Sequence, residues 1–111
     1  MLHGSQPVTF YLAICSYMRQ IIISEYQHVM DTVLRHYGMD EQPMLHSNKA
    51  ECVDARATLV AVLIQKGLTE SEMVQLTGLT QQCINKLKNS VRQREKGWSF
   101  RETMKAVCAD L

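Results

Sequence analysis

The chain has 111 residues, 46% of them hydrophobic, with five glycines, two prolines and a formal net charge of +1. This length leaves room for one domain, or for one domain with an appended helix, and excludes two full-sized domains. The scarcity of glycine and proline, together with long stretches of helical periodicity, predicts an all-α fold.

A first helical region is predicted from Ser5-Gln6-Pro7, where proline suits the first helical turn, to Gly38, where glycine ends it. The region forms either one helix or two, with Ser24 as the point of division. We interpret residues 1–24 as an apolar helical extension and residues 25–111 as the main domain. A wide apolar face on the extension is formed by Ile14, Met18, Ile21 and Ile22.

This apolar face needs a cover, because a lone helix cannot leave such a face in water. One solution is a homodimer formed through residues 7–23, since a two-fold dimer is the commonest way to bury such a surface. The other solution is that the extension folds back onto the core of its own chain.

A turn is predicted at residues 39–43 and a connector at residues 44–48, followed by a long helix over residues 49–66. Asn48 and Glu51 have the spacing of a capping pair for the start of this helix. Arg56 lies inside the same helix. We expect it to brace the neighbouring turn through a buried hydrogen bond, and contact with a phosphate is the alternative.

The segment from residue 69 to about residue 95 is predicted to form a helix-turn-helix. Thr69 and Glu72 are three residues apart, as in the capping box that starts a helix. Gly78 ends this short helix, because glycine adopts positive φ freely at a tight corner. Thr80 then caps a second helix. Such a pair can place its second helix in the major groove of DNA.

The second helix of this unit has two different faces at 100° per residue. Ile84, Leu87 and Val91 form an apolar stripe, and amide and lysine side chains lie opposite. Asn and Gln can pair with adenine, and Lys can reach guanine or phosphate; an ordinary polar surface is the alternative. The candidate DNA-binding residues are Lys49, Thr80, Gln81, Gln82, Asn85, Lys86, Lys88, Asn89 and Arg92.

Positive charge is concentrated on and after this second helix. Residues 80–101 contain six basic side chains against Glu95 alone, a balance of +5, whereas residues 1–45 have a balance of −2. A run of charge is often only a solvated face, but its position here coincides with the predicted helix-turn-helix and favours DNA contact.

A final helix is predicted over residues 100–109, with Ser99 and Glu102 as a second capping box. Trp98 and Phe100 are expected to anchor this helix to the core, with stacking on bases as the alternative. The chain is therefore predicted to be a small helical bundle of five or six helices that contains a helix-turn-helix.

No segment has the residue spacing of a catalytic, nucleotide-binding or zinc site. The four cysteines are 25 to 37 residues apart, and the common catalytic signatures do not occur. We expect no enzymatic activity, cofactor, metal or bound nucleotide, and reduced cysteines. Residues 8–23 are too few and too polar to span a membrane, and no secretory signal occurs, so a cytoplasmic protein is expected.

Several segments follow the order found in one known family. A short amphipathic helix ends in Tyr37-Gly38, and a polar connector contains Ser47-Asn48-Lys49. A long helix with Ala55-Arg56 and an aliphatic run at residues 59–63 comes next, and Leu68-Thr69-Glu70-Ser71-Glu72 opens the helix-turn-helix. In this order and spacing, residues 25 to about 110 resemble the C-terminal duplex-binding domain of the bacterial replication initiator DnaA.

The resemblance implies the fold and duplex DNA binding, while the family's recognition signature differs here. The family's Asp-His-Thr-Thr-Val is replaced by Thr80-Gln81-Gln82-Cys83-Ile84, the turn is about one residue shorter, and the connector has a single lysine. The chain contains no counterpart of the initiator's nucleotide-binding domain, so the resemblance does not imply nucleotide-driven origin opening.

These observations predict sequence-specific binding of double-stranded DNA through a helix-turn-helix, in the control of replication, transcription or a mobile element. The alternative is a helical protein-interaction module that has lost DNA binding and docks through its apolar N-terminal helix. The expected partners are double-stranded DNA and, through residues 7–23, a second copy of the chain.

Overall fold

The computed structural model describes the backbone of residues 6–111 and the side chains from residue 16 onward. Residues 1–5 of the predicted extension lie outside the described part of the chain. The described residues form helices only, which confirms the all-α prediction. These helices are α1 (Gln6–Tyr37), α2 (Glu41–His46), α3 (Ala50–Gln65), α4 (Glu70–Thr77), α5 (Gln81–Arg94) and α6 (Trp98–Ala109).

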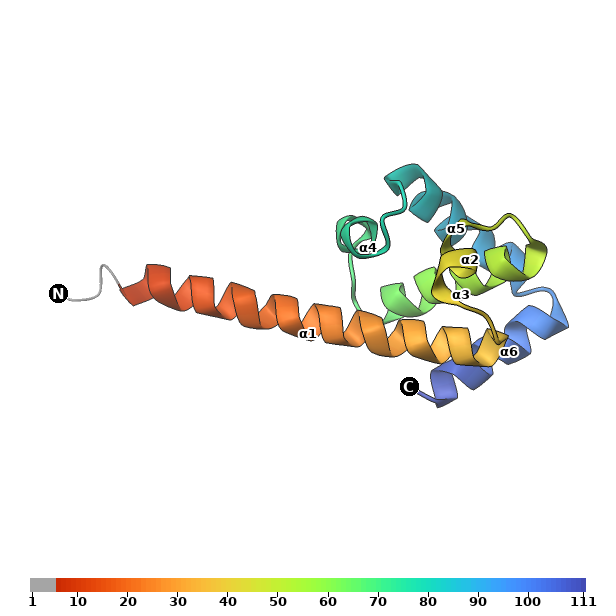
Figure 1. Cartoon of the computed structure of the whole chain (residues 1–111), viewed down its shortest axis with the longest axis horizontal. Coiled ribbons are helices and arrows are strands. Elements are labelled where there is room, and N and C mark those ends of the chain that lie inside the picture. Colours follow the sequence, from red (N-terminus) through yellow and green to blue (C-terminus); the bar gives the residue numbers. More distant parts are fainter. Residues whose placement is uncertain (1–5) are drawn as a thin grey trace.

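Helix α3 lies at the centre of the bundle and contacts all five of the other helices (Figure 1). Every residue from Ala55 to Val60 is buried, so the helix is covered around its whole circumference over this stretch. A helix in this position must be apolar on most of its surface, and the aliphatic run at residues 59–63 meets that requirement. The other helices each contribute one apolar stripe to the common core.

Helix α1 is a single unbroken helix, which settles the choice that the sequence left between one helix and two. Ser24 lies within this helix and is exposed, and at such a position a serine lowers helix stability only slightly. Only the C-terminal half packs on the bundle, through Tyr26, Val29 and Val33. The N-terminal half projects into solvent and gives the molecule its length of 62 Å (Figure 1). From Gln6 onward, the extension therefore does not fold back onto its own core.

The turn and connector predicted over residues 39–48 contain a helix, α2, and that prediction was wrong. The helix buries Met44 and Leu45 against the core. Pro43 is its third residue, a position at which the backbone N–H has no partner within a helix, so proline is tolerated there. Six residues are too few to show a helical period, and the helix forms because its two apolar side chains are buried.

Two of the predicted helix caps were also wrong. Lys49, not Asn48, is the N-cap residue of α3, and Gly97, not Ser99, is the N-cap residue of α6. Neither cap residue makes a side-chain hydrogen bond to the helix. At the start of α3, the backbone N–H of Lys49 donates instead to the hydroxyl of Ser47 at 3.2 Å.

Trp98 and Phe100 do not act together as anchors. Phe100 is buried in the core, as predicted, but Trp98 is 70% exposed. Both lie in the first turn of α6, whose buried face is formed by Phe100, Met104 and Val107. Residues two apart on a helix are separated by about 200°, so Trp98 lies on the side away from this face.

Candidate nucleic-acid interface

Helices α4 and α5 form a compact pair, and local hydrogen bonds fix the start of α4. The hydroxyl oxygen of Thr69 accepts a hydrogen bond from the backbone N–H of Glu72 at 3.1 Å. In return, the carboxylate of Glu72 accepts one from the backbone N–H of Thr69 at 2.8 Å. The capping box predicted from the sequence is confirmed.

Three residues, Gly78, Leu79 and Thr80, connect α4 to α5. Gly78 has φ +77°, the left-handed conformation that was expected of it. The hydroxyl of Thr77 accepts from the backbone N–H of Leu79 at 3.1 Å and donates to the carbonyl of Met73 at 2.6 Å. Thr80 caps α5 as predicted, because its hydroxyl oxygen accepts from the backbone N–H of Cys83 at 3.1 Å. The direction in which α5 leaves α4 is thus held by hydrogen bonds on both sides of the turn.

Helix α5 turns its apolar stripe inward. Ile84 and Leu87 are buried, and Val91 packs against the same core partly exposed. The helix rests mainly on α3 and α4. The opposite side of α5 faces solvent, which matches the orientation predicted from the 100° period.

Four amide side chains share this solvent face of α5. Gln82, Asn85 and Asn89 were predicted to lie there and are all exposed. Gln93 is also exposed and was missed, although it follows Asn89 by four residues and the helical period places it on the same face. We call Gln82, Asn85, Asn89 and Gln93 the amide stripe.

Lys86 and Arg92 lie on either side of the amide stripe. Both are exposed, and neither forms an ion pair with any other described residue. Glu95, the only acidic residue near the end of α5, lines a shallow hollow with Lys88 and Met104 on the side toward α3 and α6. The amide stripe and its two flanking cations therefore form a surface without a carboxylate.

Two other candidate residues, Gln81 and Lys88, are directed toward α4. The ammonium of Lys88 lies 2.5 Å from the carboxylate of Glu70 in an ion pair. The hydrogen bond from Lys88 is the main reason that the pKa of Glu70 lies below its ordinary value, and a hydrogen bond from Gln81 adds to the effect. The Lys88–Glu70 pair holds α5 against α4, and Lys88 therefore lends little positive charge to the solvent face.

The opposite flank of α5 is tied to α3. The guanidinium of Arg94 forms an ion pair with Asp54 and also donates to the hydroxyl of Ser90 at 3.0 Å. Of the six basic residues at positions 80–101, two are thus engaged between helices. The four that are exposed and without an ion pair to a described residue are Lys86, Arg92, Lys96 and Arg101.

Lys49 lies on a different element, at the start of α3, where it is exposed. Arg56 stabilises the loop that precedes Lys49, because its guanidinium donates to the carbonyl of Met44 at 2.8 Å and to that of Ser47 at 2.6 Å. The prediction that Arg56 braces the turn is confirmed. A groove of about 310 Å³ lies between α3 and α5 and is lined in part by Arg56 and Lys86.

No group of three or more His, Cys, Asp or Glu side chains with the arrangement of a metal site occurs from residue 16 onward. Cys52, Cys83 and Cys108 are free thiols. None of the six described helices combines the length and hydropathy of a membrane-spanning segment.

The chain matches no known protein family, no curated protein and no solved structure.

Proposed function

We propose that this protein binds double-stranded DNA, with α5 entering the major groove as the second helix of a helix-turn-helix. One observation carries the proposal: the solvent face of α5 presents four amides flanked by Lys86 and Arg92, with no carboxylate among them. Amide side chains offer a donor and an acceptor in one plane, which is the pattern that adenine presents in the major groove. A carboxylate on this face would be repelled by the phosphates.

The two kinds of side chain would have different tasks. The amide stripe would read base edges, and Lys86 and Arg92 would contact phosphates on either side of the groove. Lys49 and Lys96, exposed on neighbouring segments, would extend the phosphate contacts beyond α5. Affinity would then depend on the cations and sequence preference on the amides.

A helix that reads bases has to be held rigidly, and α5 is held on both flanks. The Lys88–Glu70 pair joins it to α4, and the Arg94–Asp54 pair joins it to α3. The cap at Thr80 and the buried stripe at Ile84 and Leu87 fix its start and its rotation. Binding sites built on such rigid elements are more exact than sites on loops.

The likeness to the duplex-binding domain of DnaA is part of this proposal and rests on the sequence segments alone. It favours a role in replication control, with transcription and mobile-element control as further settings. The altered recognition segment at residues 80–84 implies a target sequence different from that of the family.

The second candidate function is a protein-interaction module. It is favoured by the apolar side chains that α1 exposes outside the bundle, among them Tyr17, Met18 and Ile21. The two functions are compatible: a homodimer formed through residues 7–23 would present two copies of α5 to one duplex and raise affinity through linked binding.

Gel-shift titrations test the proposal. With a mixed duplex pool at about 50 mM salt we expect binding, and four phosphate contacts predict a slope of log K against log[salt] of roughly −3 to −4. The double variant Lys86→Ala/Arg92→Ala should bind several-fold more weakly. Lys105→Ala is the matched control, because Lys105 is an exposed cation on α6 paired with Glu102. Absence of binding to any duplex at ~50 mM salt would refute the proposal.

A further inference from the structure

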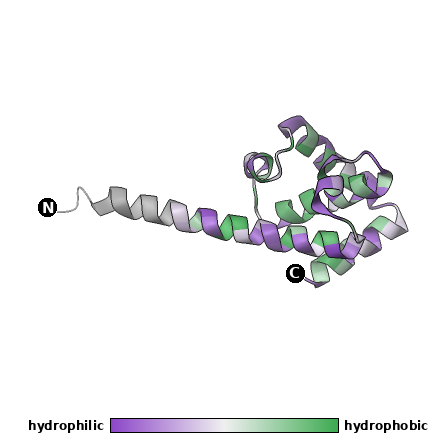
Figure 2. Ribbon diagram, in the orientation of Figure 1, coloured by the Kyte–Doolittle hydropathy of each residue, from purple (hydrophilic) through white to green (hydrophobic). Residues whose placement is uncertain are grey.

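An apolar stripe on α1 continues beyond the bundle. Within the bundle the stripe consists of Tyr26, Val29 and Val33, which are buried. Ile22 and Met18 precede Tyr26 by four and eight residues and lie on the same face of the helix. Ile22 is half-buried, whereas Met18 is 52% exposed. Figure 2 shows hydrophobic residues on α1 where the helix has left the bundle.

The sequence extends the stripe toward the N-terminus with a regular spacing. The apolar residues at positions 8, 11, 15, 18 and 22 are separated by alternating steps of three and four, the spacing of a coiled-coil seam. Residues 6–24 contain a single charged side chain, that of Arg19. A helix of this composition is stable in water only when its seam is covered.

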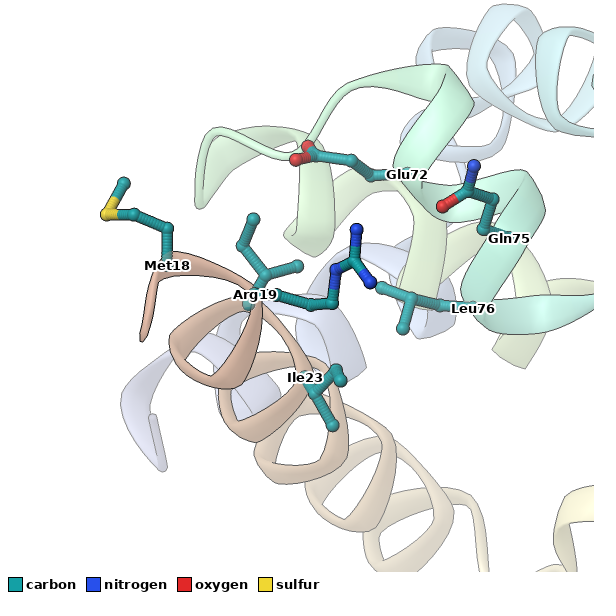
Figure 3. Close-up of a pocket in the computed structure, with 7 residues that line it drawn as sticks. Met18, Arg19, Ile23, Glu72, Gln75 and Leu76 are labelled. Atoms are coloured by element: carbon teal, nitrogen blue, oxygen red, sulfur yellow. The ribbon is translucent and has the colours of Figure 1, made fainter. Parts of the chain in front are cut away.

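A groove of about 690 Å³ begins where the stripe leaves the bundle. One wall is the α1 segment with Met18, Ile22 and Ile23, and the other is α4 with Leu76. Figure 3 shows Glu72 and Gln75 on the α4 side and the side chain of Arg19 reaching from α1 toward α4. The groove therefore has apolar side chains on both walls, the carboxylate of Glu72 on the α4 side and the guanidinium of Arg19 on the α1 side.

The chain cannot fill this groove with its own extension. Helix α1 is continuous from Gln6 to Tyr37 and carries the extension away from α4 (Figure 1). In a single copy of the chain, the apolar stripe and the groove are therefore both uncovered. The stripe lies on a helix and is apolar, so the same segment of another copy could pack into the groove.

We infer that a second copy of the chain covers both surfaces. The projecting halves of two α1 helices pair antiparallel about a two-fold axis near position 15. This register sets position 8 of one copy opposite position 22 of the other. The first turn of each α1 then enters the groove between α1 and α4 of its partner. The inference rests on the self-association included in the proposed function, and it does not require that α5 bind DNA.

Charge favours the antiparallel arrangement. The first turn of α1 has no acidic residue, so the positive end of its helix dipole is uncompensated within its own chain. In the partner's groove this end would approach the carboxylate of Glu72. A parallel pair would place both positive ends together at the far tip, away from any described acidic side chain.

The area that this pairing would bury is typical of a specific dimer of low affinity. Met18 lies on the seam, Ile21 and Ile23 lie at its two edges, all three are exposed, and the seam of residues 6–23 is about 27 Å long. We estimate about 600 Å² buried per copy, or about 1,200 Å² in total, which is the lower end of the range for specific interfaces. A dimer that forms at micromolar concentrations is the expected result.

Sedimentation of the full chain without DNA, from about 1 to 100 μM, tests the inference. The wild type should show a monomer–dimer equilibrium. Met18→Glu places a charge on the seam and should raise the dimer Kd at least tenfold, while glutamate keeps a good helix propensity. Gln20→Glu is the matched control, because Gln20 is exposed on the face opposite the seam and should leave the Kd within about twofold.

A further variant tests the groove itself. Gln75→Arg adds positive charge where the partner's helix terminus would lie and should raise the Kd several-fold. Circular dichroism of each variant confirms the helical content. A wild type that stays monomeric at about 100 μM overturns the inference, as does equal weakening by Met18→Glu and Gln20→Glu. A dimer weakened by Met18→Glu but untouched by Gln75→Arg overturns the antiparallel seating in the groove. Since no DNA is present, these outcomes are independent of the gel shifts.

Discussion

The ammonium of Lys88 lies 2.5 Å from the carboxylate of Glu70, across the gap between α5 and α4. This contact divides the basic segment of the chain into two groups with different roles. Lys88 and Arg94 are bound by acidic residues of neighbouring helices and hold α5 in place. Lys86 and Arg92 remain exposed beside the amide stripe and are the cations that could meet DNA.

This division predicts different effects for two alanine substitutions. Arg92→Ala should weaken binding to all duplex sequences about equally and should make the salt slope shallower by roughly 1. Lys88→Ala should leave the salt slope nearly unchanged, because its charge is already compensated by Glu70. Salt titrations of the two variants in parallel provide the measurement. Equal changes in slope would show that Lys88 also contacts phosphate.

The amide stripe should determine sequence preference. Gln82→Ala or Asn85→Ala should cost on the order of 1–3 kcal/mol on the preferred site and little on random duplex, because a bidentate pair with a base is lost. The preferred site is first obtained by selection from a random pool. The matched control is Gln42→Ala, an exposed amide on α2. If the wild type, Gln82→Ala and Asn85→Ala all select the same DNA sequences, α5 is not the helix that contacts the bases.

Arg56 should matter for stability rather than for DNA contact. Arg56→Met leaves the carbonyls of Met44 and Ser47 without their donor and should lower the free energy of unfolding by about 2–3 kcal/mol in urea titrations. Arg92→Met, at an exposed position, should change it by less than about 0.5 kcal/mol. A loss of similar size in both variants would mean that the hydrogen bonds of Arg56 contribute nothing specific.

The interaction of Asp110, near the C-terminus, with α1 should stabilise the fold in a pH-dependent way. The carboxylate of Asp110 lies 2.6 Å from the ring of His36 and 3.4 Å from Arg35. The hydrogen bond from His36 is the main cause that holds the pKa of Asp110 below its ordinary value. Because the pKa of Asp110 is depressed in the folded state, the ionised carboxylate stabilises the fold at pH values above its ordinary pKa. This stabilisation is lost as the pH falls through the depressed value.

Asp110→Asn should therefore lower the melting temperature at pH 7, and the difference from wild type should shrink as the pH falls below about 4. Asp31→Asn is the comparison, since Asp31 is exposed on α1 and forms no ion pair with a described residue. Melting curves that keep a constant gap between pH 7 and pH 3 would contradict the assigned role of Asp110.

The pair α4–α5 was predictable because its determinants are local. The cap at Thr69, the glycine at residue 78 and the cap at Thr80 each act within three or four residues. The apolar stripe of α5 follows from the helical period alone, and the same reasoning extended by one turn would have found Gln93. For these elements the amino-acid sequence was sufficient.

The sequence was insufficient where a distant contact decides the local structure. Helix α2 is held by the burial of Met44 and Leu45 and by Arg56, which is twelve residues from Met44. This helix has no signature within a short window of sequence. By contrast, the exposure of Trp98 follows from the helical period, because Phe100, Met104 and Val107 form the buried face of α6 and Trp98 lies on the other side.

The sequence by itself determined the helical class, the turn at Gly78 and the face of α5 that meets solvent, because periodicity and capping act between neighbours along the chain. The tertiary structure alone decided which cations are exposed on that face. Glu70 is eighteen residues from Lys88, and Asp54 is forty residues from Arg94. Charges so far apart in the chain come into contact only when the packing of the helices places them side by side, and Coulomb interactions depend on that distance.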